Sequence, residues 1–345
     1  MQRLCWRWPR PIWDCKHLFI IKTTLSMTLK EEYQASLKSS DTEEWFDLHF
    51  HRPLGFLWAK LFEKLGVSPN AITIASIFMG VAGGILLYFG QPHLAWLNWV
   101  GMLLITWADT FDSADGQLAR LTQQYSRMGR ILDGVSGDFW FAAIGFALVF
   151  RELDFGDSWT GPNYFAEHEW LIWALGIGSG LSHALQAAMA DCYRQFHLFF
   201  LKGQQGSELD SAAKLKEQYH RLEWGRNFWS KLPLFFYSGY TANQERMTPN
   251  MQRLRAALNE RYGDNGVPSQ EFRDYFRQLS LPLMKYTNIL TFNTRIIACF
   301  IAVLINMPWL YFVFEIVVLN LLLIYMVVRH EGICKKAIKE LGVRS

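Results

Sequence analysis

A group of carboxylates and one arginine lies between two hydrophobic segments in the middle of the chain. Asp112 and Asp115 are followed by Arg120, and Asp133 comes after a short polar link. An ionised aspartate at membrane depth costs about 2.5–3.5 kcal/mol on insertion scales. A multivalent cation held by several carboxylates would offset much of that cost and would give the group a chemical task. The spacing therefore predicts a metal site.

Helical spacing brings these residue types together. The two aspartates of the first helix are three residues apart and share a face, and Asp109 continues the spacing one turn earlier. Gly116 permits close approach of a backbone or a phosphate, and the planar guanidinium of Arg120 can hold phosphate oxygens. Oxygen ligands from two helices suit Mg²⁺ or Mn²⁺. The pattern indicates a metal site that handles phosphate.

Long apolar segments must position this site. Hydrophobic residues make up 51% of the chain, and they gather in runs near the roughly 20 residues that cross a bilayer. We expect six spans in an all-α integral membrane protein. Their approximate limits are Ala71–Phe89, Leu94–Thr110, Phe139–Phe150 with its upstream turns, Trp170–Ala190, Thr287–Met307 and Trp309–Val328.

The charges of the loops predict the orientation. Lys and Arg concentrate before the first span, between the second and third spans, and after the sixth, whereas the loop after the third span is mostly acidic. By the positive-inside rule the basic segments face the cytoplasm, and so does the carboxylate group. The net charge of +3 is too small to indicate nucleic-acid binding. The five scattered cysteines form no pair typical of a disulfide framework or a zinc site.

The segments outside the spans have distinct characters. We divide the chain into an N-terminal cytoplasmic tail (1–44), an interfacial helix (45–66), spans one to four with the motif (67–190), a cytoplasmic insertion of mostly helical pieces (191–283), spans five and six (284–328), and a basic cytoplasmic tail (329–345). We assign no function to residues 1–26, and Met27 is a candidate start.

The stretch before the first span is amphipathic. Residues Leu54–Leu65, which follow Pro53, interleave apolar and charged side chains. This pattern predicts a helix lying in the membrane interface, and the alternative is a helix packed on protein. Ser68-Pro69-Asn70 has the residue types of a helix start.

These residues resemble the signature of the CDP-alcohol phosphotransferases, also called CDP-alcohol phosphatidyltransferases, D-x2-D-G-x2-A-R-x8-G-x3-D-x3-D. The opening of the first span, with Asn70 and Thr73, is also similar. The resemblance covers roughly residues 45–200 and does not explain the insertion. The matching positions are Asp112, Asp115, Gly116, Ala119, Arg120, Gly129 and Asp133.

The resemblance implies a chemistry. Such enzymes displace CMP from a CDP-linked lipid or alcohol with an acceptor hydroxyl, using two Mg²⁺ or Mn²⁺ ions. It implies that Asp112, Asp115 and Asp133 are metal ligands, and that a fourth aspartate is both ligand and general base. Asn70, Gly116, Ala119, Arg120 and Gly129 would contact the CDP and its phosphates. A homodimer in a bacterial inner membrane is also implied.

The chain departs from the signature at the fourth aspartate. Gly137 stands at that position and Asp138 follows. In a regular helix position 138 lies about 140° from Asp133 and would miss the site. One hypothesis is a π-bulge over residues 134–137 that returns Asp138 to the catalytic and metal-binding face. The other is that the base is lost or replaced.

Polar residues of the fourth and fifth spans are candidates for binding the acceptor. Arg295 and Asn293 lie near the start of the fifth span, and Arg194 lies just past the fourth. A charged residue in a span rarely faces lipid. Arg295 would either bind a phosphate of the acceptor or pair internally with Glu315 or a helix carbonyl. Arg194 could equally be a surface side chain, and for His183 packing is favoured over ligation.

We therefore expect a phospholipid-synthesis transferase. It would move a phosphatidyl group from CDP-diacylglycerol to a polar alcohol, for example an inositol phosphate or a glycerol phosphate. The first alternative transfers a CDP-linked head group to a lipid alcohol. The second is a cation transporter, which would not need Gly116, Ala119 and Arg120 at these spacings.

Overall fold

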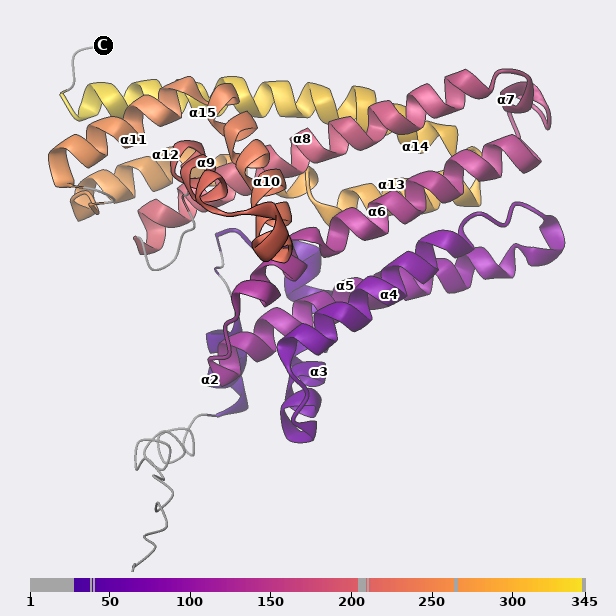
Figure 1. The fold of residues 1–345 in the computed structure, drawn as a ribbon, viewed down its shortest axis with the longest axis horizontal. Coiled ribbons are helices and arrows are strands. Elements are labelled where there is room, and N and C mark those ends of the chain that lie inside the picture. Colours follow the sequence, from indigo (N-terminus) through magenta and orange to yellow (C-terminus); the bar gives the residue numbers. More distant parts are fainter. Residues whose placement is uncertain are drawn as a thin grey trace, which may run out of the picture.

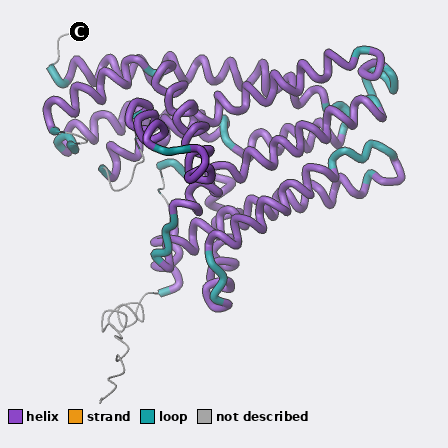
Figure 2. Tube along the Cα trace, viewed as in Figure 1, coloured by secondary structure: helices purple, strands orange, loops and turns teal. Residues whose placement is uncertain are grey.

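The computed structural model describes residues 28–37, 39, 41–203, 209, 211–263 and 266–342. Residues 1–26, to which we assign no function, and Met27, the candidate start, lie outside this part. Within it the regular elements are helices, with 84% helix and no strand (Figure 2). The all-α fold class is confirmed.

The elements follow the chain in a simple order. They are α2 (Leu29–Ser36), η2 (Asp47–His51), α3 (Arg52–Leu65), α4 (Pro69–Leu86), η3 (Pro92–Leu94), α5 (Trp96–Thr122), α6 (Arg127–Phe155), α7 (Tyr164–Glu167), α8 (Glu169–Lys202), α9 (Ala212–Arg221), α10 (Trp224–Met247), α11 (Pro249–Tyr262), α12 (Gln270–Ile289), α13 (Phe292–Leu304), α14 (Trp309–Val313), η5 (Phe314–Leu319) and α15 (Asn320–Glu340).

Helices α4, α5 and α6 pack closely because glycines remove side chains from their contacts. A Cβ atom added to Gly83 of α4 would lie 2.8 Å from the carbonyl oxygen of Gly101 of α5. A Cβ atom on Gly80 would lie 2.2 Å from the indole of Trp140 on α6. The backbones of α4 and α5 therefore approach closely at Gly83, and the indole of Trp140 packs directly on α4 at Gly80. This packing fixes the helices that carry the motif.

The segment before α4 is folded against α5. A capping box starts α2, where Thr28 and Glu31 exchange hydrogen bonds. Pro53 occupies the first turn of α3, and Gly55, Phe56 and Ala59 are buried. Part of the expected N-terminal tail is thus helical. The helix at Leu54–Leu65 is present, and its place in a membrane interface stays a prediction.

The start of α4 confirms the helix signal. Ser68 is the N-cap, and its side chain accepts a hydrogen bond from the backbone N–H of Ala71. Pro69 occupies the first turn, where its missing N–H leaves no hydrogen bond unmade.

The insertion forms a helical layer on the extended ends of two long helices. α9, α10, α11 and α12 gather at the end of the molecule where the C-terminus lies, and α7 lies at the opposite end (Figure 1). The second half of α8 and the whole of α15 pack against α11 and α12 around one hydrophobic core. Buried aromatic side chains form its centre: Tyr193, Phe196, Phe200 and Phe276.

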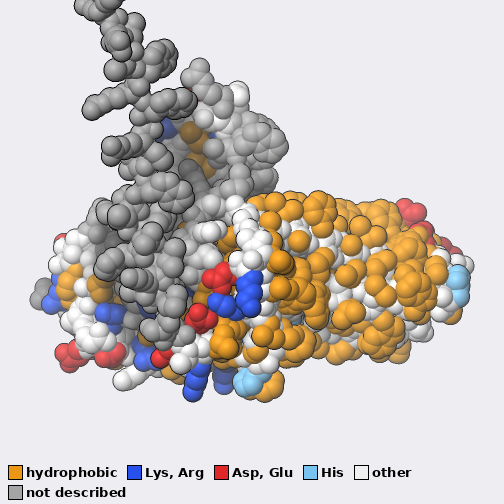
Figure 3. Space-filling model, turned by 90° about the horizontal axis from the view of Figure 1, so that it is seen from below, with side chains coloured by type: hydrophobic (Ala, Val, Ile, Leu, Met, Phe, Trp, Pro, Cys, Tyr) orange, Lys and Arg blue, Asp and Glu red, His pale blue; other side chains and the backbone are white. Residues whose placement is uncertain are grey.

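Four stretches among the described residues are long and apolar enough to cross a membrane. They are Pro69–Leu86, Leu132–Phe155, Gln270–Leu304 and Trp309–Glu340. They correspond to the expected spans one, three, five and six. The expected spans two and four fall within α5 and α8. Polar side chains make these two helices less apolar than the four stretches, so six spans are not confirmed. On the face seen in Figure 3, hydrophobic side chains nevertheless cover most of one half, and charged groups lie towards both ends.

Candidate functional site

Asp115 is held between α4 and α5. Its side chain is nearly inaccessible, with 4% of the residue exposed, and Thr73 Oγ1 of α4 donates a hydrogen bond to Asp115 Oδ2. Thr73 also lies near the carbonyl of Pro69, one turn before it. The first turns of α4 therefore orient the carboxylate of Asp115, and its role as a metal ligand stays a prediction.

Asp112 faces α6 instead. Ser136 Oγ lies 2.9 Å from Asp112 Oδ1 and 2.9 Å from the carbonyl oxygen of Asp133. Ser136 is buried, so its hydroxyl is positioned by the helix that carries it. A hydroxyl group from each neighbouring helix thus orients one carboxylate of α5: Thr73 of α4 contacts Asp115, and Ser136 of α6 contacts Asp112.

Arg120 and Asp133 differ in their exposure to solvent. Asp133 is exposed, whereas Arg120 donates from Nε to the carbonyl oxygen of Ser36 in α2. Burial, the largest influence, lowers the pKa of Arg120 to about 10, while the Asp133 carboxylate acts in the opposite direction. The guanidinium therefore stays charged near neutral pH. Among the described residues its NH2 atom is buried without a hydrogen-bond partner.

Gly116 lies directly beneath that guanidinium. A Cβ atom added there would lie 3.4 Å from NH1 and 3.5 Å from NH2 of Arg120. Ala119 lies one turn further along α5 and is half-buried. Gly116 therefore carries no side chain between α5 and the guanidinium, and its contact with a phosphate stays a prediction.

Asn70 and Gly129 fix the link between α5 and α6. Asn70 Nδ2 lies 3.1 Å from Ser126 Oγ, and Ser126 caps α6 by accepting from the backbone N–H of Gly129 at 2.8 Å. A Cβ atom on Gly129 would lie 2.4 Å from Asn70 Oδ1. The structure therefore brings these two residues together and shows them positioning the loop; their contact with CDP stays a prediction.

Asp138 does not lie on the same side of α6 as Asp133, as it would if the helix contained a π-bulge. α6 is a continuous α-helix from Arg127 to Phe155, with no π-helical turn at residues 134–137. The bulge hypothesis is therefore wrong. Gly134 and Gly137 have open space where a Cβ atom would be, so no packing forces an extra residue into the turn. The π-helical turns of the described residues are η2 and η5.

Arg295 is committed to internal partners. It is 1% exposed, and it donates to Glu315 Oε2, to His183 Nδ1 at 2.7 Å, to Gln186 Oε1 at 2.8 Å and to the carbonyl oxygen of Leu290 at 2.9 and 3.2 Å. These contacts use all five donor hydrogens of a guanidinium. The structure therefore shows the internal alternative for Arg295 and leaves it no hydrogen for an acceptor.

Asn293 and Arg194 lie next to a second acidic group. Asn293 Nδ2 donates to Glu44 Oε2 at 2.7 Å and to Asp47 Oδ1 at 2.8 Å. Arg194 donates to Asn288 Oδ1 at 3.2 Å and acts electrostatically on both carboxylates. Burial raises the pKa of Glu44 and of Asp47. The predicted acceptor residues therefore border a half-buried acidic region.

Sequence reasoning missed the residues that reach the motif from elsewhere in the chain. Ser136 lies on the expected motif helix and carried no signal of its own. Ser36 and His51 come from segments whose approach to α5 no local pattern reveals. Only proximity in the fold identifies these residues.

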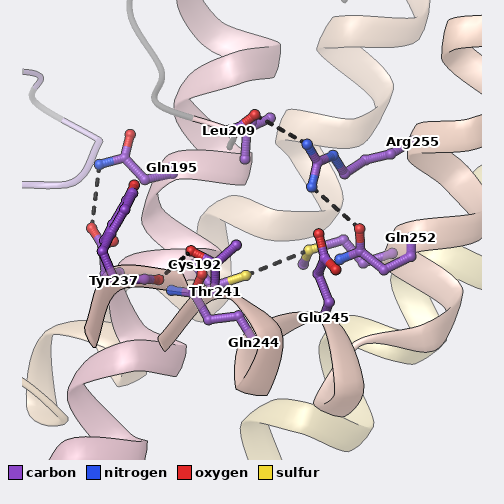
Figure 4. Close-up of a pocket in the computed structure, with 11 residues that line it drawn as sticks. Cys192, Gln195, Leu209, Tyr237, Thr241, Gln244, Glu245, Gln252 and Arg255 are labelled. Carbon is purple, nitrogen blue, oxygen red and sulfur yellow. Dashed lines mark hydrogen bonds between the residues drawn. The ribbon is translucent and has the colours of Figure 1, made fainter. Parts of the chain in front are cut away.

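A small cavity in the insertion is not a nucleotide site. It has a volume of about 20 Å³ and lies between α8, α10 and α11, where Gln195, Thr241 and Gln244 surround it (Figure 4). Arg255 donates to the carbonyl oxygen of Leu209 at 3.1 Å, and Gln244 donates to that of Ala188 at 2.7 Å. Because one water needs about 10–15 Å³, the cavity accommodates water only.

Comparison with known families agrees with the motif. Residues 66–180, one third of the chain, match the family model of CDP-alcohol phosphatidyltransferases. This segment contains α4, α5 and α6 with every signature position, and the inferred resemblance is confirmed for it. No curated protein matches the chain. The family match and the four apolar helices together support a transferase in a membrane.

Proposed function

We propose that this chain transfers a phosphatidyl group from CDP-diacylglycerol to the hydroxyl of a polar alcohol, with release of CMP. The observation that carries the proposal is that Thr73 orients Asp115 and Ser136 orients Asp112, beside the buried NH2 atom of Arg120, to which the described residues offer no hydrogen-bond acceptor. Two oriented carboxylates and an available guanidinium nitrogen form a suitable receptor for metal-bound pyrophosphate.

The residues present fit Mg²⁺ or Mn²⁺. Asp112, Asp115 and Asp133 supply only oxygen, which both ions prefer. Two such ions would neutralise charge on the pyrophosphate and on the departing CMP. Arg120 would bind a phosphate oxygen through its NH2 atom. Asn70 would act by holding the loop that ends at Gly129.

The proton of the acceptor hydroxyl needs a base that the signature position does not supply. Gly137 carries no side chain, and the regular helix turns Asp138 away from Asp133. Asp133 is exposed at the start of α6, so we assign it the additional role of accepting the proton. This assignment replaces the role that the bulge would have given to Asp138.

The acceptor is a membrane-accessible polar alcohol, with inositol phosphate and glycerol phosphate as the first candidates. Arg194 is the charged residue that supports an anionic acceptor, since Arg295 is fully engaged. Transfer of a CDP-linked head group to a lipid alcohol uses the same motif and remains the alternative. A homodimer, with the motif on the cytoplasmic side of a bacterial inner membrane, completes the proposal.

The test measures CMP release by purified protein in mixed micelles with Mg²⁺ or Mn²⁺. CDP-diacylglycerol is offered with glycerol 3-phosphate, an inositol phosphate or inositol. We expect CMP release with one acceptor, at least about 1,000-fold less with Asp112→Asn, and normal release with Asp154→Asn, an exposed carboxylate at the far end of α6. CMP release only from CDP-choline and diacylglycerol would favour the alternative. Cation flux in vesicles without CMP release from either donor would support the transporter.

A further inference from the structure

His51 brings a nitrogen ligand next to two carboxylates. It ends the π-helical turn η2, and its side chain is 3% exposed. His51 Nε2 lies 3.1 Å from Asp109 Oδ2 of α5. One ligand atom from each of Asp47, His51 and Asp109 lies within 4.8 Å of the other two. Three metal-binding residues therefore converge from η2 and α5.

The hydrogen bonds around His51 point its lone pair at this group. Thr110 Oγ1 donates to the carbonyl oxygen of Thr106 at 3.0 Å, which uses its single hydrogen. The same oxygen lies 3.0 Å from His51 Nδ1, so it accepts the hydrogen of Nδ1. In the neutral imidazole Nε2 then carries a lone pair and faces the Asp109 oxygen, so the two atoms repel each other. A cation bound by both atoms would make the arrangement favourable.

Neighbouring side chains orient the carboxylates around His51, and these carboxylates outnumber the arginines near them. Asn293 donates to both Glu44 and Asp47. Arg52 is engaged by Glu43 through Nε at 2.8 Å and donates to Ser113 Oγ at 3.2 Å. Arg52 and Arg194 act on the group from nearby, but together they face three carboxylates besides Glu43: Glu44, Asp47 and Asp109. A divalent ion would neutralise this buried excess of carboxylates.

The site differs from the motif in position and in ligand type. Asp109 and Asp112 are three residues apart on α5, an axial offset of about 4.5 Å. Their side chains have different partners, because Asp109 contacts η2 whereas Asp112 contacts α6. The motif supplies oxygen alone, whereas this group adds an imidazole, which suits Zn²⁺ or Fe²⁺, to carboxylates, which also accept Mn²⁺.

We propose that Asp47, His51 and Asp109 bind a divalent transition-metal ion that fastens the N-terminal segment to α5 beside the motif. The ion would hold the π-helical turn in place and with it the residues that surround Asn293. Its role is to position these elements, and its binding does not depend on the transferase activity.

The experiment uses the full chain in detergent, stripped of metal and reloaded with Mn²⁺. Bound metal is counted by mass spectrometry, and electron spin echo modulation reports any nitrogen bound to Mn²⁺. In the double variant Asp112→Asn/Asp115→Asn, which disables the motif, we expect one remaining equivalent with a nitrogen signal. His51→Gln should lose that equivalent and the signal. His49→Gln is the matched control, because His49 lies on the same turn and is exposed.

Asp47→Asn is the second variant. Because Asp47 is half-buried and His51 is buried, this substitution disturbs folding less than His51→Gln does. It should bind Mn²⁺ at least about ten-fold more weakly. The proposal fails if His51→Gln binds as much metal as His49→Gln, or if the motif double variant shows no nitrogen signal. The second result would mean that Nε2 carries hydrogen and donates it to Asp109. Neither readout requires turnover, so failure of the proposed transferase would leave this test intact.

Discussion

The hydroxyl of Thr73 in α4 donates to the carboxylate of Asp115 in α5, so the first apolar helix directly orients a residue of the motif. The contact joins the two helices near the buried end of the site, where only 4% of Asp115 is exposed. A carboxylate in such a position has few alternative partners, and its geometry depends on that hydroxyl.

Replacement of Thr73 by valine keeps the shape and removes the hydrogen bond. Hydrogen bonds to charged groups contribute about 1.5–3 kcal/mol, so we expect CMP release to fall about 10- to 100-fold. Thr73→Ser should retain most of the activity, and it serves as the control. Steady-state rates of CMP release measured over a range of Mg²⁺ concentrations would show whether the variant needs more Mg²⁺ to reach its maximal rate. Equal rates for the valine and serine variants would contradict an orienting role.

Gly137 occupies the position of the missing carboxylate, and the space for a side chain is open. We expect Gly137→Asp to raise CMP release, because an aspartate one turn after Asp133 would supply the base that the signature contains. Gly137→Asn is the isosteric control and should not raise it. Asp138→Asn should change the rate less than about three-fold. A large loss in Asp138→Asn would show that this carboxylate reaches the site despite the regular helix.

Arg295 and Glu315 form a buried ion pair whose members are 1% and 0% exposed. Arg295→Met leaves the carboxylate without its partner, and we expect a destabilisation of about 3–5 kcal/mol. The double variant Arg295→Met/Glu315→Gln should recover part of that loss because no isolated charge remains. Thermal unfolding in detergent would measure both. Equal stability of the single and double variants would rule out a charge-pair role.

Asp41 links the N-terminal segment to the insertion and predicts an acid-sensitive contact. Arg277 donates to it from Nε at 2.6 Å and from NH2 at 2.9 Å, and His197 Nε2 lies 3.2 Å from the same carboxylate. The Arg277 hydrogen bonds lower the pKa of Asp41 from its usual 3.8. The stabilisation is therefore complete above about pH 3.8 and is lost as the pH falls through the lower folded-state pKa.

The measurement compares the melting temperatures of the unsubstituted chain and Asp41→Asn between pH 3 and pH 7. We expect Asp41→Asn to melt at a lower temperature than the unsubstituted chain at neutral pH. The difference between the two melting temperatures should narrow below about pH 3.8, where Asp41 begins to protonate in the unfolded chain. Glu271→Gln is the control, because Glu271 is an exposed carboxylate of the same helix, α12. A difference between Asp41→Asn and the unsubstituted chain that is constant with pH would contradict the ion-pair origin.

Most of the helices and the motif follow from local rules that the amino-acid sequence alone satisfies. Ser68 and Pro69 start α4, and the spacing of Asp112, Asp115 and Gly116 places them on the region of α5 that we propose binds phosphate. These features depend on residues within one or two helical turns, where geometry follows directly from the backbone period. The family match over residues 66–180 covers the same local signals.

Tertiary structure decided what each polar residue contacts. Arg295 was ambiguous in the sequence because its partners Glu315 and His183 come from other helices. Asp138 was ambiguous because a bulge depends on packing, and the open space at Gly137 leaves α6 regular. His51 meets Asp109 only because α3 and η2 fold back onto α5. Contacts between distant segments depend on how whole helices pack, and a period of 3.6 residues carries no information about that packing.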